Sequence, residues 1–233
     1  MNFAFQNSLL GKLTPQDLAA FAPELQRADL EPKTMVLTPD APIEFVYFPE
    51  NCVCSVLATT ASEKPIEVGM FGFEGMSNFV VRPGDKSYFQ TVVLFGGQAW
   101  RVGADRFSQS LLTLPSLNEV VLRFKDASAI QFGFTAFANG VFSIEERLAR
   151  WILMAHDRTA GDAIRIVHDT LAVVLSVRRS GVTTALHVLE GERAVKAERG
   201  VLTIRDRAKL EEIAGESYGP PEKAYRELMD YQA

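Results

Sequence analysis

The hydrophobic pattern of roughly the first 110 residues predicts short β-strands. The candidate strands are rich in β-branched and aromatic residues, and turn-forming residues separate them at hairpin-like intervals. They cover residues 45–48, 53–59, 65–71, 88–95 and 98–102. Short helices are predicted after the Thr14-Pro15-Gln16-Asp17 start and over residues 104–112. Several short strands at this spacing favour an antiparallel barrel or jelly roll.

The hydrophobic period changes over residues 115–141, where apolar side chains recur at steps of three and four. This pattern predicts one long helix with a single apolar stripe. The stripe, a candidate dimer interface, includes Leu117, Val120, Phe124, Ala127, Phe134 and Phe137. At ~1.5 Å per residue, the helix is longer than a small domain needs. Gly133 lies inside it and costs roughly 1 kcal/mol unless something packs closely there. The stripe alone fits a helix on its own barrel and a helix paired with a second copy equally well.

A second domain is predicted after the long helix. Ser143-Ile144-Glu145-Glu146 has the form of a capping box and begins a new helix over residues 144–154. Helices over 169–175 and 180–189, strands over 194–197 and 201–204, and a helix over 208–214 follow. Two helices, a short turn and a hairpin form a winged helix-turn-helix. The expected fold class is α+β, with an antiparallel barrel or jelly roll over 1–114, a long helix, the candidate dimerisation helix, over 115–141 and a winged helix-turn-helix domain, the candidate DNA-binding domain, over 142–233.

The second of these two helices has an apolar inner face and a polar outer face. Val182, Leu186 and Leu189 recur on the inner face at helical spacing. The outer face and the helix start contain groups that bond to phosphates or base edges: Arg178, Arg179, Ser180, Thr183, Thr184 and His187. The two arginines lie at the N-terminal end, which a recognition helix inserts into the major groove. We therefore expect this helix to contact double-stranded DNA.

Composition and charge are consistent with such a protein. The 233 residues are 47% hydrophobic with a net charge of −5, which excludes intrinsic disorder and a disulfide scaffold. The charge is uneven, because residues 143–209 contain 12 Lys/Arg against 9 Asp/Glu while both flanking segments are acidic. A basic segment between acidic ones indicates a polyanionic partner. No apolar run is long enough to span a bilayer, and we expect a cytoplasmic protein without a membrane partner.

Catalytic and metal chemistry are not expected. No nucleophile, histidine and carboxylate have the spacing of a catalytic unit, and no phosphate-binding loop is present. Cys52 and Cys54 are two residues apart, and we expect their side chains to point to opposite faces of a strand. On that expectation they form neither a disulfide nor a metal site. The sequence thus predicts a protein that is not an enzyme and has no cofactor.

Three runs of sequence resemble the DNA-binding half of the Crp/Fnr family of bacterial transcription regulators. They are EERLARWILMAHDR (145–158), LAVVLSVRRSGVTTALHVLE (171–190) and RGVLTIRDRAKLEE (199–212). VYFPENCVCSVL (46–57), VGMFGFEGM (68–76) and the long helix follow the same order as in the family. The resemblance implies a homodimer of effector-sensing, cyclic-nucleotide-binding-like β-rolls, joined by the long helix to winged helix-turn-helix domains. Double-stranded DNA is the implied partner, with RNA polymerase and an unidentified small-molecule effector as candidates.

The resemblance also implies roles for single residues. Arg179 falls where the family has its guanine-contacting arginine, and Ser180 and Thr184 fall at base-contacting positions where other residues are common. Arg199 at the tip of the wing resembles a phosphate contact. Ser176 takes a turn position usually held by glycine, where a positive φ is common.

The implied effector pocket is incomplete. Gly72, Glu74 and Gly75 resemble the first part of the cyclic-nucleotide motif, with one residue inserted. Gln90, followed by Thr91, stands where cyclic-nucleotide binders have an arginine for the phosphate, and Arg82 could replace it only after a loop rearrangement. A neutral amide is a weaker partner for phosphate than a guanidinium, so we expect no binding of cyclic AMP.

An iron–sulfur cluster needs four thiolates, and the chain has two cysteines. The alternative function is a degenerate dimeric β-roll that binds a protein partner and has lost DNA binding.

Overall fold

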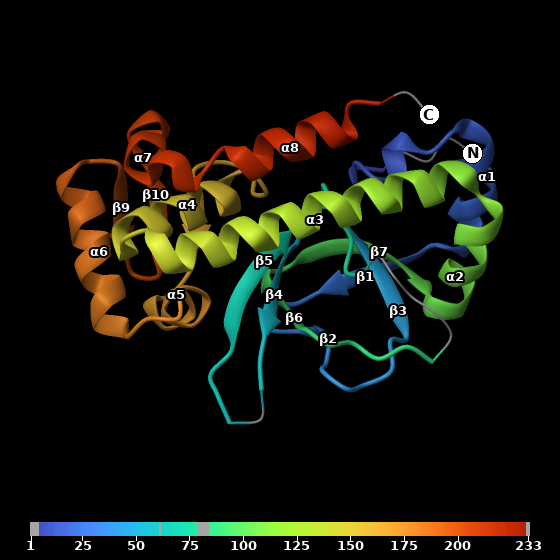
Figure 1. Ribbon diagram of the computed structural model, residues 1–233, viewed down its shortest axis with the longest axis horizontal. Coiled ribbons are helices and arrows are strands. Elements are labelled where there is room, and N and C mark those ends of the chain that lie inside the picture. Colours follow the sequence, from blue (N-terminus) through green and yellow to red (C-terminus); the bar gives the residue numbers. More distant parts are fainter. Residues whose placement is uncertain (1–4, 61, 79–83, 232–233) are drawn as a thin grey trace. The chain divides into compact units, whose positions relative to one another are not determined.

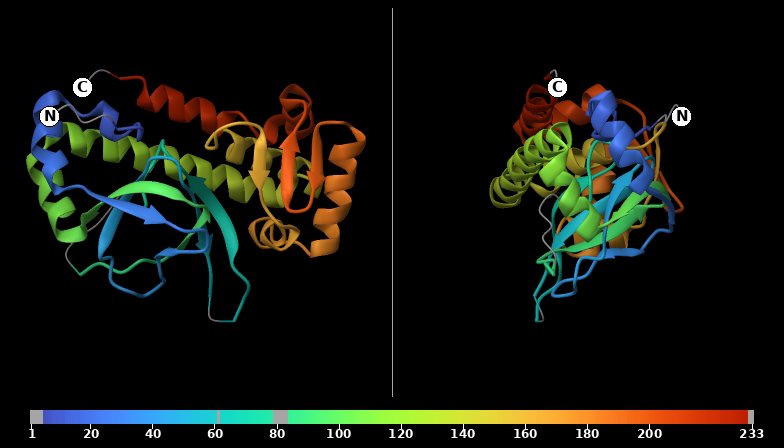
Figure 2. Two further views of the ribbon diagram at one scale, coloured as in Figure 1. Left: turned by 180° about the vertical axis from the view of Figure 1, so that it is seen from behind. Right: turned by 90° about the vertical axis from the view of Figure 1, so that its right-hand side faces the viewer.

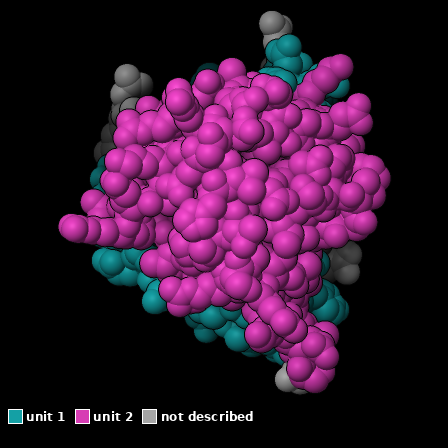
Figure 3. Space-filling view, turned by 90° about the vertical axis from the view of Figure 1, so that its left-hand side faces the viewer, with its two compact units in different colours: residues 1–56, 70–129, 224–233 teal, residues 57–69, 130–223 magenta. Residues whose placement is uncertain are grey.

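The computed structural model describes residues 5–60, 62–78 and 84–231 (Figure 1); Arg82 lies outside them. Helices and antiparallel sheets form the predicted α+β fold. The chain divides into two compact units, coloured separately in Figure 3. Unit 1 comprises residues 1–56, 70–129 and 224–233, and unit 2 comprises 57–69 and 130–223. The predicted division into three ranges is a different one and stays a prediction.

Two antiparallel sheets form the roll that the strand pattern predicts. The first has the order β1 (Gln26–Leu30), β7 (Gly97–Gly103), β3 (Phe45–Pro49), with Ala28 opposite Ala99 and Phe48 opposite Trp100. The second has the order β2 (Met35–Leu37), β6 (Gln90–Phe95), β4 (Val53–Ala58), β5 (Ile66–Phe71). The five predicted strands correspond to β3 to β7. The pattern did not predict β1, which has mostly polar residues, or β2, which has only three residues.

Aromatic packing joins the helices of unit 1 to the first sheet. Phe21 of α1 (Pro15–Phe21), Phe48 of β3 and Phe107 of α2 (Ala104–Thr113) are fully buried, with ring centroids 6.1 to 6.5 Å apart. Short 3-10 turns precede and follow α1 at Leu10–Lys12 and Ala22–Glu24. The Asp17 carboxylate of α1 accepts hydrogen bonds from Ser116 N at 2.8 Å and Ser116 Oγ at 2.6 Å. This contact fixes the beginning of the long helix that starts at Pro115.

The long helix α3 spans Pro115–Val141, as predicted. Its predicted stripe is largely covered by the chain itself, because Leu117, Val120, Phe124 and Ala127 are at most 5% exposed. Phe134 is half-buried and Phe137 is 52% exposed. An exposed face recurs at helical spacing and shares Phe137 with the predicted stripe; its other members are Leu122, Ala129, Gly133, Ala136, Gly140 and Val141.

Unit 2 contains the predicted winged helix-turn-helix. Its helices are α4 (Ile144–His156), α5 (His168–Val174), α6 (Arg179–Gly191) and α7 (Arg207–Ala214), and its sheet has the order β8 (Ala163–Arg165), β10 (Val201–Ile204), β9 (Val195–Glu198). Ser143 and Glu146 form the predicted capping box of α4. Leu148, Ile152, Val182, Leu189 and Leu210 are fully buried and form the core of the unit. α6 packs beside β9, as the view from behind shows (Figure 2).

The C-terminal residues return to unit 1. A 3-10 turn (Gly215–Ser217) precedes α8 (Pro220–Met229), which the hydrophobic pattern did not predict. The Tyr225 hydroxyl donates to the Glu74 carbonyl oxygen at 2.7 Å, and Arg123 Nη1 of α3 donates to the Leu228 carbonyl oxygen at 3.0 Å. Across residues 5–60, 62–78 and 84–231, no helix combines the length and the apolar character needed to cross a bilayer.

The expectation that the Cys52 and Cys54 side chains point to opposite faces of a strand is wrong. Side chains two residues apart along extended chain lie on the same face, and Cys52 and Cys54 are both free, fully buried and hydrogen-bonded to one another. The hydrogen bond from Cys54 lowers the pKa of Cys52. The same bond and burial raise the pKa of Cys54 well above its ordinary value.

Candidate nucleic-acid interface

The turn between α5 and α6 is a Schellman motif. Ser176 has φ 52°, Ser176 N donates to the Val173 carbonyl at 3.1 Å, and Val177 N donates to the Ala172 carbonyl at 3.0 Å. The prediction that Ser176 occupies a position with positive φ is confirmed. This turn sets the angle at which the chain enters α6.

Contacts with α4 and the core hold the two helices in place. The Arg147 guanidinium of α4 donates to the carbonyl of Leu175, the last residue of the α5 cap. Partial burial lowers the pKa of Arg147 below its ordinary value. Val182, Leu186 and Leu189 bury the inner face of α6, so the opposite face of α6 points to solvent.

The predicted DNA-contacting residues of α6 lie together on that solvent face. Arg178 is the N-cap residue and Arg179 begins the helix. Arg178, Arg179, Ser180, Thr184 and His187 are exposed, while Thr183 is half-buried. Thr184 Oγ1 donates to the Ser180 carbonyl at 3.1 Å, and its remaining lone pairs can accept from a base or a water. The face can therefore supply both cationic donors and hydroxyl acceptors.

Two residues of α5 join this face, although the sequence analysis did not select them. Asp169 Oδ1 lies 3.4 Å from Arg179 Nη1, and His168 Nδ1 lies 3.2 Å from Thr183 Oγ1. Both residues belong to the first turn of α5. The sequence feature that could have identified them is their position at the start of the first helix of the helix-turn-helix, beside the start of the second helix.

The wing places Arg199 at its tip. β9 and β10 pair antiparallel with Glu198 opposite Val201, so Arg199 and Gly200 form a two-residue turn. Their φ values are 48° and 79°, and two positive φ values are those of a type I′ turn. Arg199 is exposed. A left-handed arginine is unfavourable by about 1–2 kcal/mol relative to the right-handed conformation, which points to a role outside folding.

Glu190 connects α6 to the wing. Its Oε1 accepts from Ala197 N of β9 at 2.9 Å, and its Oε2 lies 3.4 Å from His187 Nδ1. The contact fixes the wing relative to the exposed face of α6. Arg199 and the α6 residues thus belong to one rigid domain.

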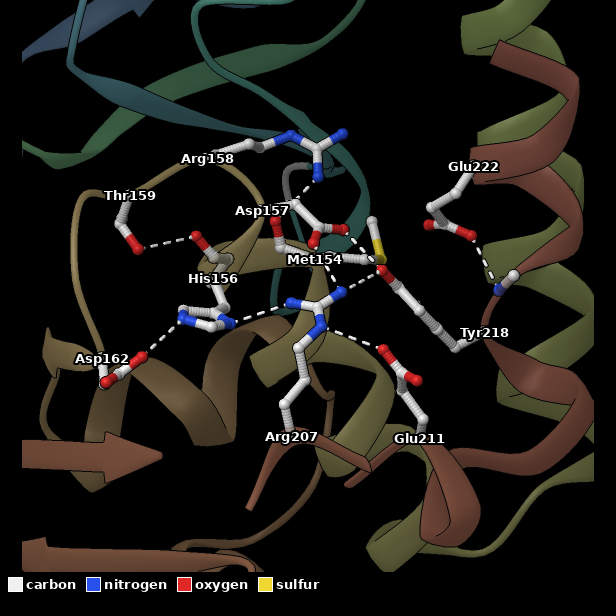
Figure 4. Close-up of polar contacts among 12 residues, drawn as sticks. Met154, His156, Asp157, Arg158, Thr159, Asp162, Arg207, Glu211, Tyr218 and Glu222 are labelled. Carbon is white, nitrogen blue, oxygen red and sulfur yellow. Dashed lines mark hydrogen bonds and ion pairs between the residues drawn. The ribbon is translucent and has the colours of Figure 1, made fainter. Parts of the chain in front are cut away.

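A partly buried polar cluster joins α4 to α7 and to the chain before β8 (Figure 4). Arg207 at its centre donates to Asp157 Oδ1 at 2.8 Å, to the Tyr218 hydroxyl at 2.8 Å and to Glu211 Oε1 at 2.9 Å. Its Nη1 lies 2.8 Å from His156 Nδ1. Because a guanidinium only donates, that His156 nitrogen accepts, and Nε2 donates to Asp162 Oδ1 at 3.1 Å.

The protonation of the cluster follows from these contacts. Burial, together with the hydrogen bond to Asp157, raises the pKa of Tyr218 well above its ordinary value. Burial acts to lower the pKa of Arg207, but the hydrogen bond and charge of Asp157 outweigh it and raise that pKa. The cluster therefore holds a neutral Tyr218 and a charged Arg207 at neutral pH, and its role is to brace the domain that presents α6.

The predicted effector residues lie in unit 1. Glu74 is buried, and its Oε2 accepts from Gly72 N at 3.0 Å across the turn. Gly75 leaves no room for a side chain, since an added Cβ would lie 2.7 Å from the Phe124 ring. Gln90 is half-buried, whereas Thr91 is 1% exposed and its Oγ1 has no hydrogen-bond partner among the described residues. Within the described ranges no three His, Cys, Asp or Glu side chains could hold a metal ion together.

The geometry of unit 2 is that of a winged helix-turn-helix protein. Residues 146–213 match the family model of the Crp-like helix-turn-helix domain. No curated protein matches the chain.

Solved structures share the fold of both units. A Crp/Fnr-family transcriptional regulator from Eubacterium rectale matches over 88% of this chain and 97% of its own, at 15% identity and TM-score 0.68. FixK2 from Bradyrhizobium japonicum matches over 82% and 98%, at 11% identity and TM-score 0.70. The c-di-GMP-responsive regulator CLP from Xanthomonas campestris matches over 82% and 99%, at 14% identity and TM-score 0.64. The predicted resemblance to the Crp/Fnr family is confirmed by the fold and by the helix-turn-helix domain.

Proposed function

We propose that this chain is a sequence-specific DNA-binding transcription regulator of the Crp/Fnr type. The observation that supports the proposal most strongly is the exposed face of α6, where Arg178, Arg179, Ser180, Thr184 and His187 gather opposite a fully apolar inner face. A helix of this kind fits the major groove with its N-terminal residues at the base edges. The shared fold with a Crp/Fnr-family transcriptional regulator supports the same function.

Each exposed group has a chemical role in this proposal. Arg179 contacts guanine, since a guanidinium can donate two parallel hydrogen bonds to guanine O6 and N7. Ser180, Thr183, Thr184 and His187 contact neighbouring bases or phosphates. Arg178 and Arg199 contact phosphates, and the left-handed conformation of Arg199 holds its side chain at the tip of the wing.

The proposed regulator is a homodimer that pairs through the exposed face of α3. Gly133 supports this assignment, because a Cβ added there would meet nothing within 4 Å among the residues that the structure describes. A helix-interior glycine costs about 1 kcal/mol relative to alanine, and no contact among those residues requires it. Close packing of a second α3 helix against this face explains why glycine occupies position 133. A two-fold dimer then binds a near-palindromic operator.

The proposed regulator does not respond to cyclic AMP. Gln90 cannot supply the charge-assisted bond that a cyclic phosphate requires, whereas the buried Thr91 hydroxyl offers a neutral partner to some other effector. Calorimetry is therefore expected to show no binding of cyclic AMP or cyclic GMP, and a micromolar dissociation constant for either would contradict this part. RNA polymerase is a further partner of a regulator of this type.

Selection from random double-stranded DNA tests the proposed function. The expected result is enrichment of a near-palindrome with half-sites about one helical turn apart. If no sequence is enriched and the protein does not retard mixed genomic fragments, the proposal fails. The chain is then a dimeric β-roll module for a protein partner.

A further inference from the structure

The ion pair between Asp169 and Arg179 lies on an exposed surface, where such a contact adds little to the stability of the fold. The two side chains are 70% and 68% exposed, with Asp169 Oδ1 3.4 Å from Arg179 Nη1. Ion pairs this exposed contribute little to stability, since water screens them and two long side chains lose freedom. The carboxylate nevertheless lies beside the guanidinium proposed to contact guanine, on a surface proposed to meet phosphates. Its effect on DNA binding is therefore expected to exceed its effect on folding.

A negative charge on a DNA-binding surface has two consequences for binding to non-specific DNA. It repels every phosphate that approaches, whatever the base sequence. It also occupies Arg179 in the free protein, so this guanidinium is less available as a general phosphate contact. Both effects weaken binding to non-specific DNA.

Specific binding does not suffer in the same way. A guanidinium has five N–H donors, and a bidentate guanine contact uses two of them. Asp169 can keep one donor of Arg179 while guanine O6 and N7 accept from two of the others. The carboxylate then holds the planar group in one orientation, which limits the freedom lost when it binds the base.

We propose that Asp169 is a specificity-determining residue of the DNA interface, which positions the Arg179 guanidinium and withholds its charge from phosphates. The inference rests on the proposed function of α6. Asp169 belongs to α5 and Arg179 to α6, so the contact also links the two helices on the surface that meets DNA.

The test compares Asp169→Asn with the wild type on two duplexes of equal length, one with the selected operator and one with scrambled half-sites. We expect Asp169→Asn to bind the scrambled duplex about 3- to 10-fold more tightly, with a salt slope steeper by about one counterion per subunit. Affinity for the operator rises less, so the ratio of the two dissociation constants falls. An unchanged ratio would overturn the inference.

Two further variants separate the positioning role from a general charge effect. Glu212→Gln removes the same charge from an exposed side chain, which pairs with Lys209 on α7, and is expected to leave the ratio unchanged. In the Arg179→Ala background, Asp169→Asn should no longer alter the ratio, because its partner is gone; a ratio that still falls would contradict the positioning role. If the wild type itself prefers no sequence, the proposed function fails, and that outcome is distinct from failure of the Asp169 inference.

Discussion

Ser176 and Arg199, two of the non-glycine residues of unit 2 with a left-handed backbone conformation, adopt it for different reasons. Ser176, φ 52°, closes the Schellman motif after α5, while Arg199, φ 48°, forms the tip of the wing. Glycine adopts this conformation without the steric cost of a Cβ. Replacing either residue by glycine is therefore expected to raise the free energy of unfolding by about 0.5–1 kcal/mol, as measured by urea denaturation.

The two glycine variants should differ in DNA binding. Ser176→Gly is expected to bind operator as the wild type does, because no phosphate or base contact is assigned to Ser176. Arg199→Gly should bind every duplex more weakly, since it loses a phosphate contact. A gain in stability without loss of DNA affinity at Arg199 would show that the strained arginine has no role at the DNA.

The sequence alone was sufficient to predict which α6 residues are buried and which are exposed. Apolar residues at steps of three and four mark the inner face, so the positions of Val182, Leu186 and Leu189 define the outer face as well. The pairing of Asp169 with Arg179 could not be predicted in this way. It depends on how two helices cross, which periodicity within one helix does not specify.

At the scale of elements, α3 has two apolar faces that differ in exposure within a single chain. The strongest apolar stripe, through Leu117, Val120 and Phe124, is buried within a single chain. The weaker stripe of small and apolar residues, among them Ala129, Gly133 and Phe137, is the one left exposed. The hydrophobic pattern therefore predicted that a face of α3 is buried. It did not predict whether the chain itself or a second copy covers that face, because both can cover the same kind of apolar surface.

The dimer prediction therefore concerns the exposed face of α3. Phe137→Glu places a charge on this face and Gly133→Leu prevents close approach, so both should shift the protein from dimer to folded monomer. Leu112→Glu, at a residue of α2 that is 87% exposed, is the matched control and should stay dimeric. Sedimentation equilibrium at tens of micromolar measures the result; a monomeric wild type, or dimeric variants at both positions, would contradict the assignment.

The elements that the sequence did not predict share a physical cause. β1 has three polar residues among five, β2 and β8 have three residues each, and α8 begins with two prolines and is mostly polar. Pairing with a neighbouring strand, or docking of a chain end, stabilises such segments from outside. Their own hydrophobic pattern is therefore too weak to predict them.

At the scale of the whole molecule, α6 is proposed to select the DNA sequence, and the wing is proposed to bind phosphate only. The fold follows from patterns that local sequence contains, namely short alternating strands, one long helix and a capped helical domain. The identity of an effector cannot be predicted from the sequence, because the Gly72–Gly75 turn and the Gln90-Thr91 pair lack the arginine that would identify a cyclic nucleotide.

Binding titrations of Arg179→Ala and Arg199→Ala test whether α6 is the recognition helix. They use the selected operator and a scrambled duplex at several salt concentrations. A bidentate arginine–guanine contact contributes about 1–3 kcal/mol of discrimination. Arg179→Ala should therefore weaken operator binding about 5- to 150-fold while changing scrambled binding less. Arg199→Ala should weaken both duplexes alike and lower the salt slope by about one counterion per subunit. If Arg179→Ala binds the operator as tightly as the wild type, α6 is not the recognition helix and the account is contradicted.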